Sequence, residues 1–240
     1  MENPSILILH GWNLSSSVFE PLVTQFRSYG FKTYCMDLPG FGKSIKPLKP
    51  LYLSDYVNFV TDFIRKKKLL KTVLIGHSFG GRIGIKIAAQ NSGIIRALVL
   101  TGTPGYNPVP KLKIKFFLLL AILGRLIFSI PFLKVYQDIV RRLLYKAAQA
   151  TDFYNTDVKM RQTFKNIISE DLKIYQKMIK TPTLLLWGQD DTIVPVAIAR
   201  QMTKIISQSK LKIISSQKHN LPYKQPQIFA QCVIDYLKTL

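Results

Sequence analysis

The chain has 240 residues, 48% of them hydrophobic, which is enough to bury the core of one large domain. Its formal net charge is +21, but the excess of basic residues is spread as 8, 8 and 5 over residues 1–104, 105–178 and 179–240, which argues against a dedicated nucleic-acid surface. The two cysteines, Cys35 and Cys232, are too few for a disulfide framework and exclude a disulfide-rich secreted fold.

Short apolar runs typical of buried strands alternate with segments typical of helices along most of the chain. Strands are expected from residue 6 into a His-Gly turn and at 33–36, 72–75, 97–100, 183–186 and 212–214. Helices are expected at 18–29, 54–68, 79–90, 196–207 and 226–239, with Ser54 as an N-cap and Pro195 and Pro226 in first turns. Because this alternation builds parallel sheets, the predicted fold class is α/β, a mostly parallel sheet flanked by helices.

The alternation stops between residues 104 and 179, where the pattern becomes wholly helical. We therefore expect a core made of residues 1–104 and 179–240, with residues 105–178 inserted as a helical cap.

The most apolar part of this insertion is residues 116–133, FFLLLAILGRLIFSIPFL, with lysines on both sides. A membrane-spanning helix is not expected, because Arg125 near its centre would cost about 2.5 to 3.5 kcal/mol on insertion scales. Two interpretations are open: a pair of cap helices that cover the active site, and an interfacial surface that docks on lipid. Either one favours apolar substrates.

The pentapeptide Gly76-His77-Ser78-Phe79-Gly80 lies between an apolar run and a helical segment. A GxSxG serine in that setting usually sits on a strained strand-to-helix turn, where its hydroxyl points toward substrate. As a nucleophile, Ser78 would need a base to take its proton and an acid to orient that base.

Histidine is scarce, which makes the search for the base short. His77 is poorly placed to reach the adjacent serine and His10 belongs to another motif, so His219 is the candidate base. The acid should lie between serine and histidine in the chain. Asp190 and Asp191 directly follow the strand at 183–186 and its Trp-Gly pair, and both are candidates.

The first strand runs into His10-Gly11-Trp12. Attack by a serine creates a tetrahedral oxyanion, which needs two N–H donors held in place. In this arrangement the donors come from the residue after the nucleophile and from the first loop, so we expect the backbone N–H groups of Phe79 and Trp12. His10 is expected to brace the loop, since a second base has no proton to move.

Together these motifs resemble the α/β-hydrolase superfamily, and especially its serine esterases with a helical cap. The resemblance runs from residue 6 to about residue 228 and rests on GHSFGG, HGW, DLPGFGKS, WGQDDTIVP and His219. It implies an α/β-hydrolase fold and cleavage of esters through an acyl-serine. It also selects Asp191 as the acid, three residues after the glycine of the WG pair, and gives Asp37 a structural role.

Three features distinguish this chain within the resemblance. Family members open with a strand hairpin before the HG strand, but only residues 1–5 precede that strand here. The N-terminal edge strands are therefore expected to be missing, and the HG strand is expected to begin the sheet. The edge that this leaves must be covered, short or charged. Ser78 replaces the aspartate nucleophile of haloalkane dehalogenases and epoxide hydrolases. Trp12-Asn13 replaces the further glycines of proline iminopeptidases and carbon–carbon bond hydrolases.

The sequence thus predicts a carboxylic ester hydrolase with small-molecule substrates. An acyltransferase, a cofactor-free perhydrolase and a non-catalytic ligand-binding protein on the same fold are the alternatives. No cofactor or metal site is expected, because CxxC and HExxH motifs are absent. No charged-then-apolar leader precedes the first strand, so the cytoplasm is expected, with peripheral contact to an anionic membrane or an acyl carrier left open.

Overall fold

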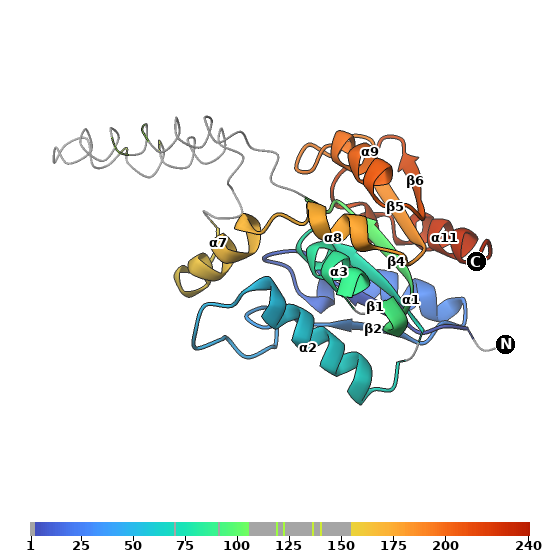
Figure 1. Ribbon diagram of the computed structural model, residues 1–240, viewed down its shortest axis with the longest axis horizontal. Helices are drawn as coiled ribbons and strands as arrows, with labels where there is room; N and C mark the ends of the chain where they lie inside the picture. The colour runs from blue at the N-terminus through green and yellow to red at the C-terminus, as the bar shows by residue number, and fades with distance from the viewer. Residues whose placement is uncertain are drawn as a thin grey trace.

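A computed structural model describes residues 3–69, 71–90, 92–105 and 155–240, together with residues 119, 122, 136 and 140. Its strands form one sheet in the order β2-β1-β3-β4-β5-β6, and every neighbouring pair is parallel (Figure 1). In chain order the strands are β1 (Ile6–Leu9), β2 (Thr33–Met36), β3 (Thr72–His77), β4 (Ile95–Thr101), β5 (Thr183–Gly188) and β6 (Ser209–Ile214).

Helices cover both faces of the sheet (Figure 1). One layer contains α2 (Leu53–Lys66), α3 (Phe79–Gln90), α8 (Lys173–Met178) and α9 (Val196–Ile205), and the other contains α1 (Glu20–Ser28), α10 (Leu221–Lys224) and α11 (Pro226–Leu237). Further helical segments are α7 (Arg161–Ser169) and the 3-10 turns η1 (Ser16–Phe19), η2 (Ser92–Ile94) and η4 (Val158–Met160).

The central strands are mostly apolar because each of their faces packs against a helical layer. In β1, Leu7 and Leu9 belong to the core under α2 and α3, whereas Ile6 and Ile8 belong to the core under α1 and α11. All four side chains are fully buried. Side chains of successive strand residues point to opposite faces, so one short run serves both cores.

The edge of the sheet is not where the sequence suggested. β1 lies between β2 and β3, with Ile6 opposite both Thr33 and Val73, so the strand at this edge is β2. The chain returns through α1 to place β2 on the outer side of β1, as crossover connections between parallel strands allow. The edge strand is only four residues long, which limits pairing with another chain.

The start of α2 also differs from expectation, because Ser54 lies inside the helix. The side chain that satisfies the helix start is Asp55, whose Oδ2 accepts the backbone N–H of Tyr52 at 2.7 Å. Asp55 is three residues after Tyr52, the spacing at which a carboxylate reaches back to the N-cap amide.

Of the predicted cap, residues 105–178, the described part from residue 155 onward forms η4, α7 and α8. The apolar stretch 116–133 lies outside the described residues except for Leu119 and Ile122, which are both more than half exposed. The division into core and cap therefore stays a prediction. Within the described part of the chain, no helix has both the length and the apolar character needed to cross a membrane.

Candidate active site

Ser78 occupies the sharp turn between β3 and α3. Its φ is +51°, a left-handed conformation that side-chain-bearing residues rarely adopt and that stores strain. The turn is held by the N–H of Ser78, which donates to Thr101 O at 2.9 Å, and by the N–H of Gly80, which donates to His10 O at 3.1 Å. A Cβ on Gly80 would lie 2.3 Å from Leu9 O, so only glycine lets α3 approach β1 this closely.

The structure brings Asp191 and His219 into direct contact. His219 Nδ1 and Asp191 Oδ2 are 2.8 Å apart, and Asp191 Oδ1 accepts the N–H groups of Ile193 at 2.9 Å and Val194 at 2.8 Å. The Asp191 side chain is almost fully buried, whereas Asp190 is exposed. Because a carboxylate only accepts, Nδ1 carries the proton of a neutral His219 and Nε2 is left as an acceptor. Geometry thus favours Asp191 over Asp190 as the partner of the histidine.

The His219 ring lies over the carboxyl ends of the central strands, beside the Ser78 turn. Its centroid is 4.7 Å from that of His77, the residue before Ser78, and a Cβ on Gly102 at the end of β4 would lie 2.6 Å from His219 Cε1. Ser78 Oγ makes no hydrogen bond to any other described residue. Hydrogen bonds between a nucleophile and its base are often long before substrate binds, so the arrangement is compatible with a triad.

The two residues expected to supply the oxyanion donors are in contact through their side chains. The ring centroids of Trp12 and Phe79 are 5.2 Å apart, and neither backbone N–H has an acceptor among the described residues. Trp12 is fixed by its indole Nε1–H, which donates to Thr156 Oγ1 at 2.8 Å. The N–H of Phe79 opens α3 and has no intrahelical partner, and two such free N–H groups beside a strained serine are a feature typical of an anion-binding hole.

His10 braces the loop that carries Trp12. Its Nδ1–H donates to Gly11 O at 2.8 Å, and its Nε2 accepts the N–H of Leu38 at 3.0 Å. This pattern requires the neutral ring, and burial lowers the pKa of His10, which keeps it neutral. Both ring nitrogens are occupied, as expected for a structural histidine.

Asp37 also has a structural position. Its two carboxylate oxygens accept the N–H of Ser16 at 2.6 Å and the N–H of Lys43 at 2.8 Å. Burial acts to raise the pKa of Asp37, but these hydrogen bonds outweigh it and the pKa lies below its usual range. The ionised side chain thus ties together the loops that follow β1 and β2.

A buried polar cluster on α3 was not anticipated from the sequence. The Arg82 guanidinium donates to the carbonyl oxygens of Pro104 at 2.7 Å, Ile167 at 2.8 Å and Glu170. One turn later, Lys86 Nζ lies 2.6 Å from Glu170 Oε1. Burial lowers the pKa of Arg82 to about 10. We call this set of contacts the Arg82 clamp; its only signal in the sequence is a pair of basic residues four apart in an otherwise apolar helix.

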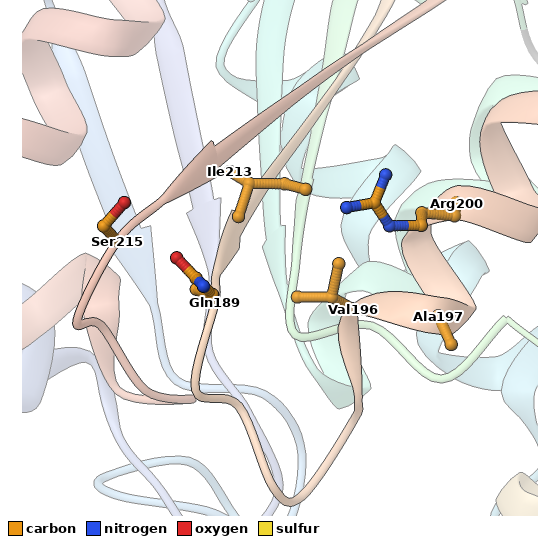
Figure 2. A pocket seen from close by; sticks show the side chains of 6 residues that line it. All are labelled: Gln189, Val196, Ala197, Arg200, Ile213 and Ser215. Carbon is orange, nitrogen blue, oxygen red and sulfur yellow. The ribbon is translucent and has the colours of Figure 1, made fainter.

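A separate open hollow of about 540 Å³ lies between the first half of α9 and the ends of β5 and β6 (Figure 2). It is lined by Gln189, Val196, Ala197, Arg200, Ile213 and Ser215. None of the three expected triad residues lines it, so it is distinct from the site around Ser78.

The family model described as "Serine aminopeptidase, S33" matches residues 2–225. The chain belongs to this family of α/β hydrolases. It is 28% identical over 256 residues to pimeloyl-(acyl-carrier protein) methyl ester esterase of Wigglesworthia glossinidia brevipalpis. The alignment covers 98% of this chain and 93% of that protein. It is 24% identical over 268 residues to human monoacylglycerol lipase ABHD6, covering 99% of this chain and 76% of the lipase.

Among solved structures, an esterase from Exiguobacterium antarcticum matches with a TM-score of 0.76 at 21% identity, covering 99% of this chain and 92% of that chain. At this identity the likeness establishes the fold alone. The expected α/β-hydrolase fold class is confirmed, and the chain is a hydrolase.

Proposed function

We propose that this hydrolase cleaves carboxylic esters through an acyl-serine intermediate. Ser78 Oγ attacks the ester carbonyl while His219 Nε2 takes its proton, and the imidazolium then gives that proton to the leaving alcohol. In the second step His219 takes a proton from water, and the water attacks the acyl-serine. The imidazolium then returns the proton to Ser78 Oγ as the carboxylic acid leaves. Asp191 holds the imidazolium throughout. The observation that carries the proposal is the 2.8 Å contact between His219 and Asp191 beside the strained Ser78 turn.

The backbone N–H groups of Trp12 and Phe79 are proposed to bind the oxyanion. Their support is that both are unpaired in the described part of the chain and that the loop carrying Trp12 is braced by His10. Loss of one such donor typically costs about 2.7 to 4 kcal/mol of transition-state stabilisation. Because these donors belong to the backbone, substitution cannot delete them directly.

An apolar substrate is favoured by the rings that surround the proposed oxyanion site. The Trp12 indole packs edge-on against Phe41, Phe79 and Phe164, with centroid distances of 4.8, 5.2 and 5.0 Å. Such a wall excludes water and offers little to a charged group. The two relatives named above, an esterase and a lipase, support an ester substrate in place of the peptide that the family description suggests.

Partner and location follow as further proposals. The relative that acts on an ester of an acyl carrier protein and the net charge of +21 support an acidic acyl carrier or an anionic membrane as partner. We propose a cytoplasmic enzyme that contacts one of them peripherally.

The test begins with labelling of the purified protein by a fluorophosphonate probe, comparing wild type with Ser78→Ala. Labelling should vanish in the variant, because only an activated serine reacts. Hydrolysis of p-nitrophenyl esters of increasing chain length should then favour longer acyl groups, with aminoacyl p-nitroanilides turned over poorly. Preference for acetate, or for the anilides, would contradict the proposed substrate class. Labelling that persists in Ser78→Ala would refute the nucleophile.

The acid is tested by a matched pair of variants. Asp191→Asn should lower kcat by about 10³- to 10⁴-fold, since the amide no longer selects the productive histidine tautomer. Asp190→Asn should leave kcat near wild type, because Asp190 is exposed and its backbone N–H bonds Gln217 O. The reverse ranking would overturn the assignment.

A further inference from the structure

The loop between β2 and α2 carries unusually exposed apolar side chains. Leu48 and Ile45 are the most exposed large apolar residues among those the structure describes, at 102% and 88%. Tyr52 at the end of the loop and Val158 in η4 are also well exposed. We call these four residues the apolar tip. Single exposed apolar residues are ordinary, but a group of them with side chains extended into water indicates an interaction site.

The apolar tip is surrounded by positive charge. The same loop contributes Lys43, Lys46 and Lys49, and residues 43–52 contain no acidic residue. Lys159 lies next to Val158, and all four lysines are exposed. Three acidic residues lie beside the tip and its lysines: Asp157, which is paired with Lys46 at 2.6 Å, Asp55, which accepts the N–H of Tyr52, and Asp37, which accepts the N–H of Lys43. Four lysines against three aspartates leave the rim with a small net positive charge.

Hydrogen bonds hold the two segments of the tip together. Besides the ion pair of Lys46, the N–H of Leu51 donates to Thr163 Oγ1 at 3.0 Å, and Asn166 Nδ2 donates to Leu51 O at 3.2 Å. The loop therefore rests on α7, and both lie on the same side of the molecule in Figure 1. The exposed side chains stand on a fixed support that lowers the entropy cost of docking.

The apolar tip is joined to the proposed oxyanion loop through a short path. Thr156, which accepts the Trp12 indole N–H, is one residue before Asp157 and two before Val158. A surface that sits on the tip therefore lies on the Trp12 side of the active site.

We infer that the apolar tip and its lysines form a docking surface for an anionic lipid membrane. Apolar side chains enter the boundary between headgroups and acyl chains, while lysines around them pair with anionic headgroups. The lysines alone would be enough to bind a flat acidic protein, but such a partner would leave the side chains of Ile45 and Leu48 in water. Docking at the tip would bring apolar esters of the membrane to the active site. Only this role in catalysis rests on the proposed function; the binding of lipid does not.

The binding test uses co-sedimentation with vesicles of phosphatidylcholine alone or mixed with phosphatidylglycerol. Wild type should bind the mixed vesicles and bind phosphatidylcholine weakly. Ile45→Ser with Leu48→Ser should weaken binding at least about tenfold, through lost apolar burial. Lys43→Gln with Lys49→Gln should weaken it about 25-fold, at about fivefold per lysine. Thermal melting confirms that these variants fold.

Matched controls separate docking from general stickiness. Ile174→Ser with Ile228→Ser removes exposed apolar residues elsewhere, and Lys66→Gln with Lys67→Gln removes charge from the most basic run. Both controls should bind as wild type does. Equal losses in tip and control variants, or unchanged binding by the tip variants, would overturn the inference. So would tip variants that lose an acidic acyl carrier protein but keep the vesicles.

The result is independent of catalysis, because Ser78→Ala should bind vesicles as wild type does. Tip variants should hydrolyse a soluble p-nitrophenyl ester normally while losing activity on esters embedded in anionic vesicles. A wild-type protein that binds vesicles but hydrolyses no ester would refute the proposed function and leave the docking surface standing.

Discussion

Replacing Arg82 by methionine should destabilise the fold severely. Methionine keeps much of the side chain's apolar stem but leaves the carbonyl oxygens of Pro104, Ile167 and Glu170 without their donor. A hydrogen bond from a charged donor contributes about 1.5 to 3 kcal/mol. Three do not simply add, because the variant also escapes the desolvation that lowers the pKa of Arg82 to about 10. We expect a net loss of about 3 to 5 kcal/mol, the range found when one partner of a buried ionic network is removed.

Urea denaturation followed by tryptophan fluorescence measures this loss, since Trp12 and Trp187 are both buried and report on the two sides of the proposed site. Lys86→Met is the control, because Lys86 makes one partly buried ion pair and should cost clearly less. An Arg82→Met protein within about 1 kcal/mol of wild type would refute the clamp as a stabilising element. So would equal losses in the two variants.

Other predictions concern buried groups near the proposed site. Burial lowers the pKa of His77 well below 6.5, so in acid the unfolded chain binds more protons than the folded chain. The free energy of unfolding should therefore fall by about 1 kcal/mol from about pH 7.5 to 5.5. Urea titrations of His77→Asn should show a shallower fall. Gly80→Ala should cost at least about 2 kcal/mol because its Cβ meets Leu9 O, whereas Gly93→Ala, with open space around it, should be near neutral in the same melts. Burial raises the pKa of the Cys35 thiol to about 12, so peptide mapping should find it unalkylated by iodoacetamide until urea is added.

Local patterns were sufficient to predict most elements of the fold. β2 and α3 begin and end at the predicted residues, because an apolar run and a glycine-rich start define them without reference to the rest of the chain. Four other strands, β3, β4, β5 and β6, extend one to three residues beyond an end of the predicted runs. The pairing of Asp191 with His219 could also be predicted from the sequence. Both residues lie in loops that follow neighbouring strands of a parallel sheet, and such loops meet at the same edge of the sheet.

Features that depend on distant partners were not predictable. Arg82 and Lys86 read as ordinary helix residues until Glu170 is placed beside them, and nothing local marks that pairing. The position of β2 at the sheet edge depends on the direction of a crossover, which a run of four residues does not encode. Ser54 failed as a cap because Asp55 offers Tyr52 a stronger acceptor one residue later.

The pairing of β4 with β5 has a consequence for how this protein can change. Leu98 lies opposite Thr183, although residues 102–182 separate the two strands along the chain. The entropy lost in closing such a segment grows only with the logarithm of its length, by about 0.6 kcal/mol for each doubling. The length of the segment between β4 and β5 therefore has little effect on the stability of the sheet, and the Arg82 clamp holds residues 104, 167 and 170 of that segment. Insertions and deletions can accumulate in this segment while the stability of the sheet is retained.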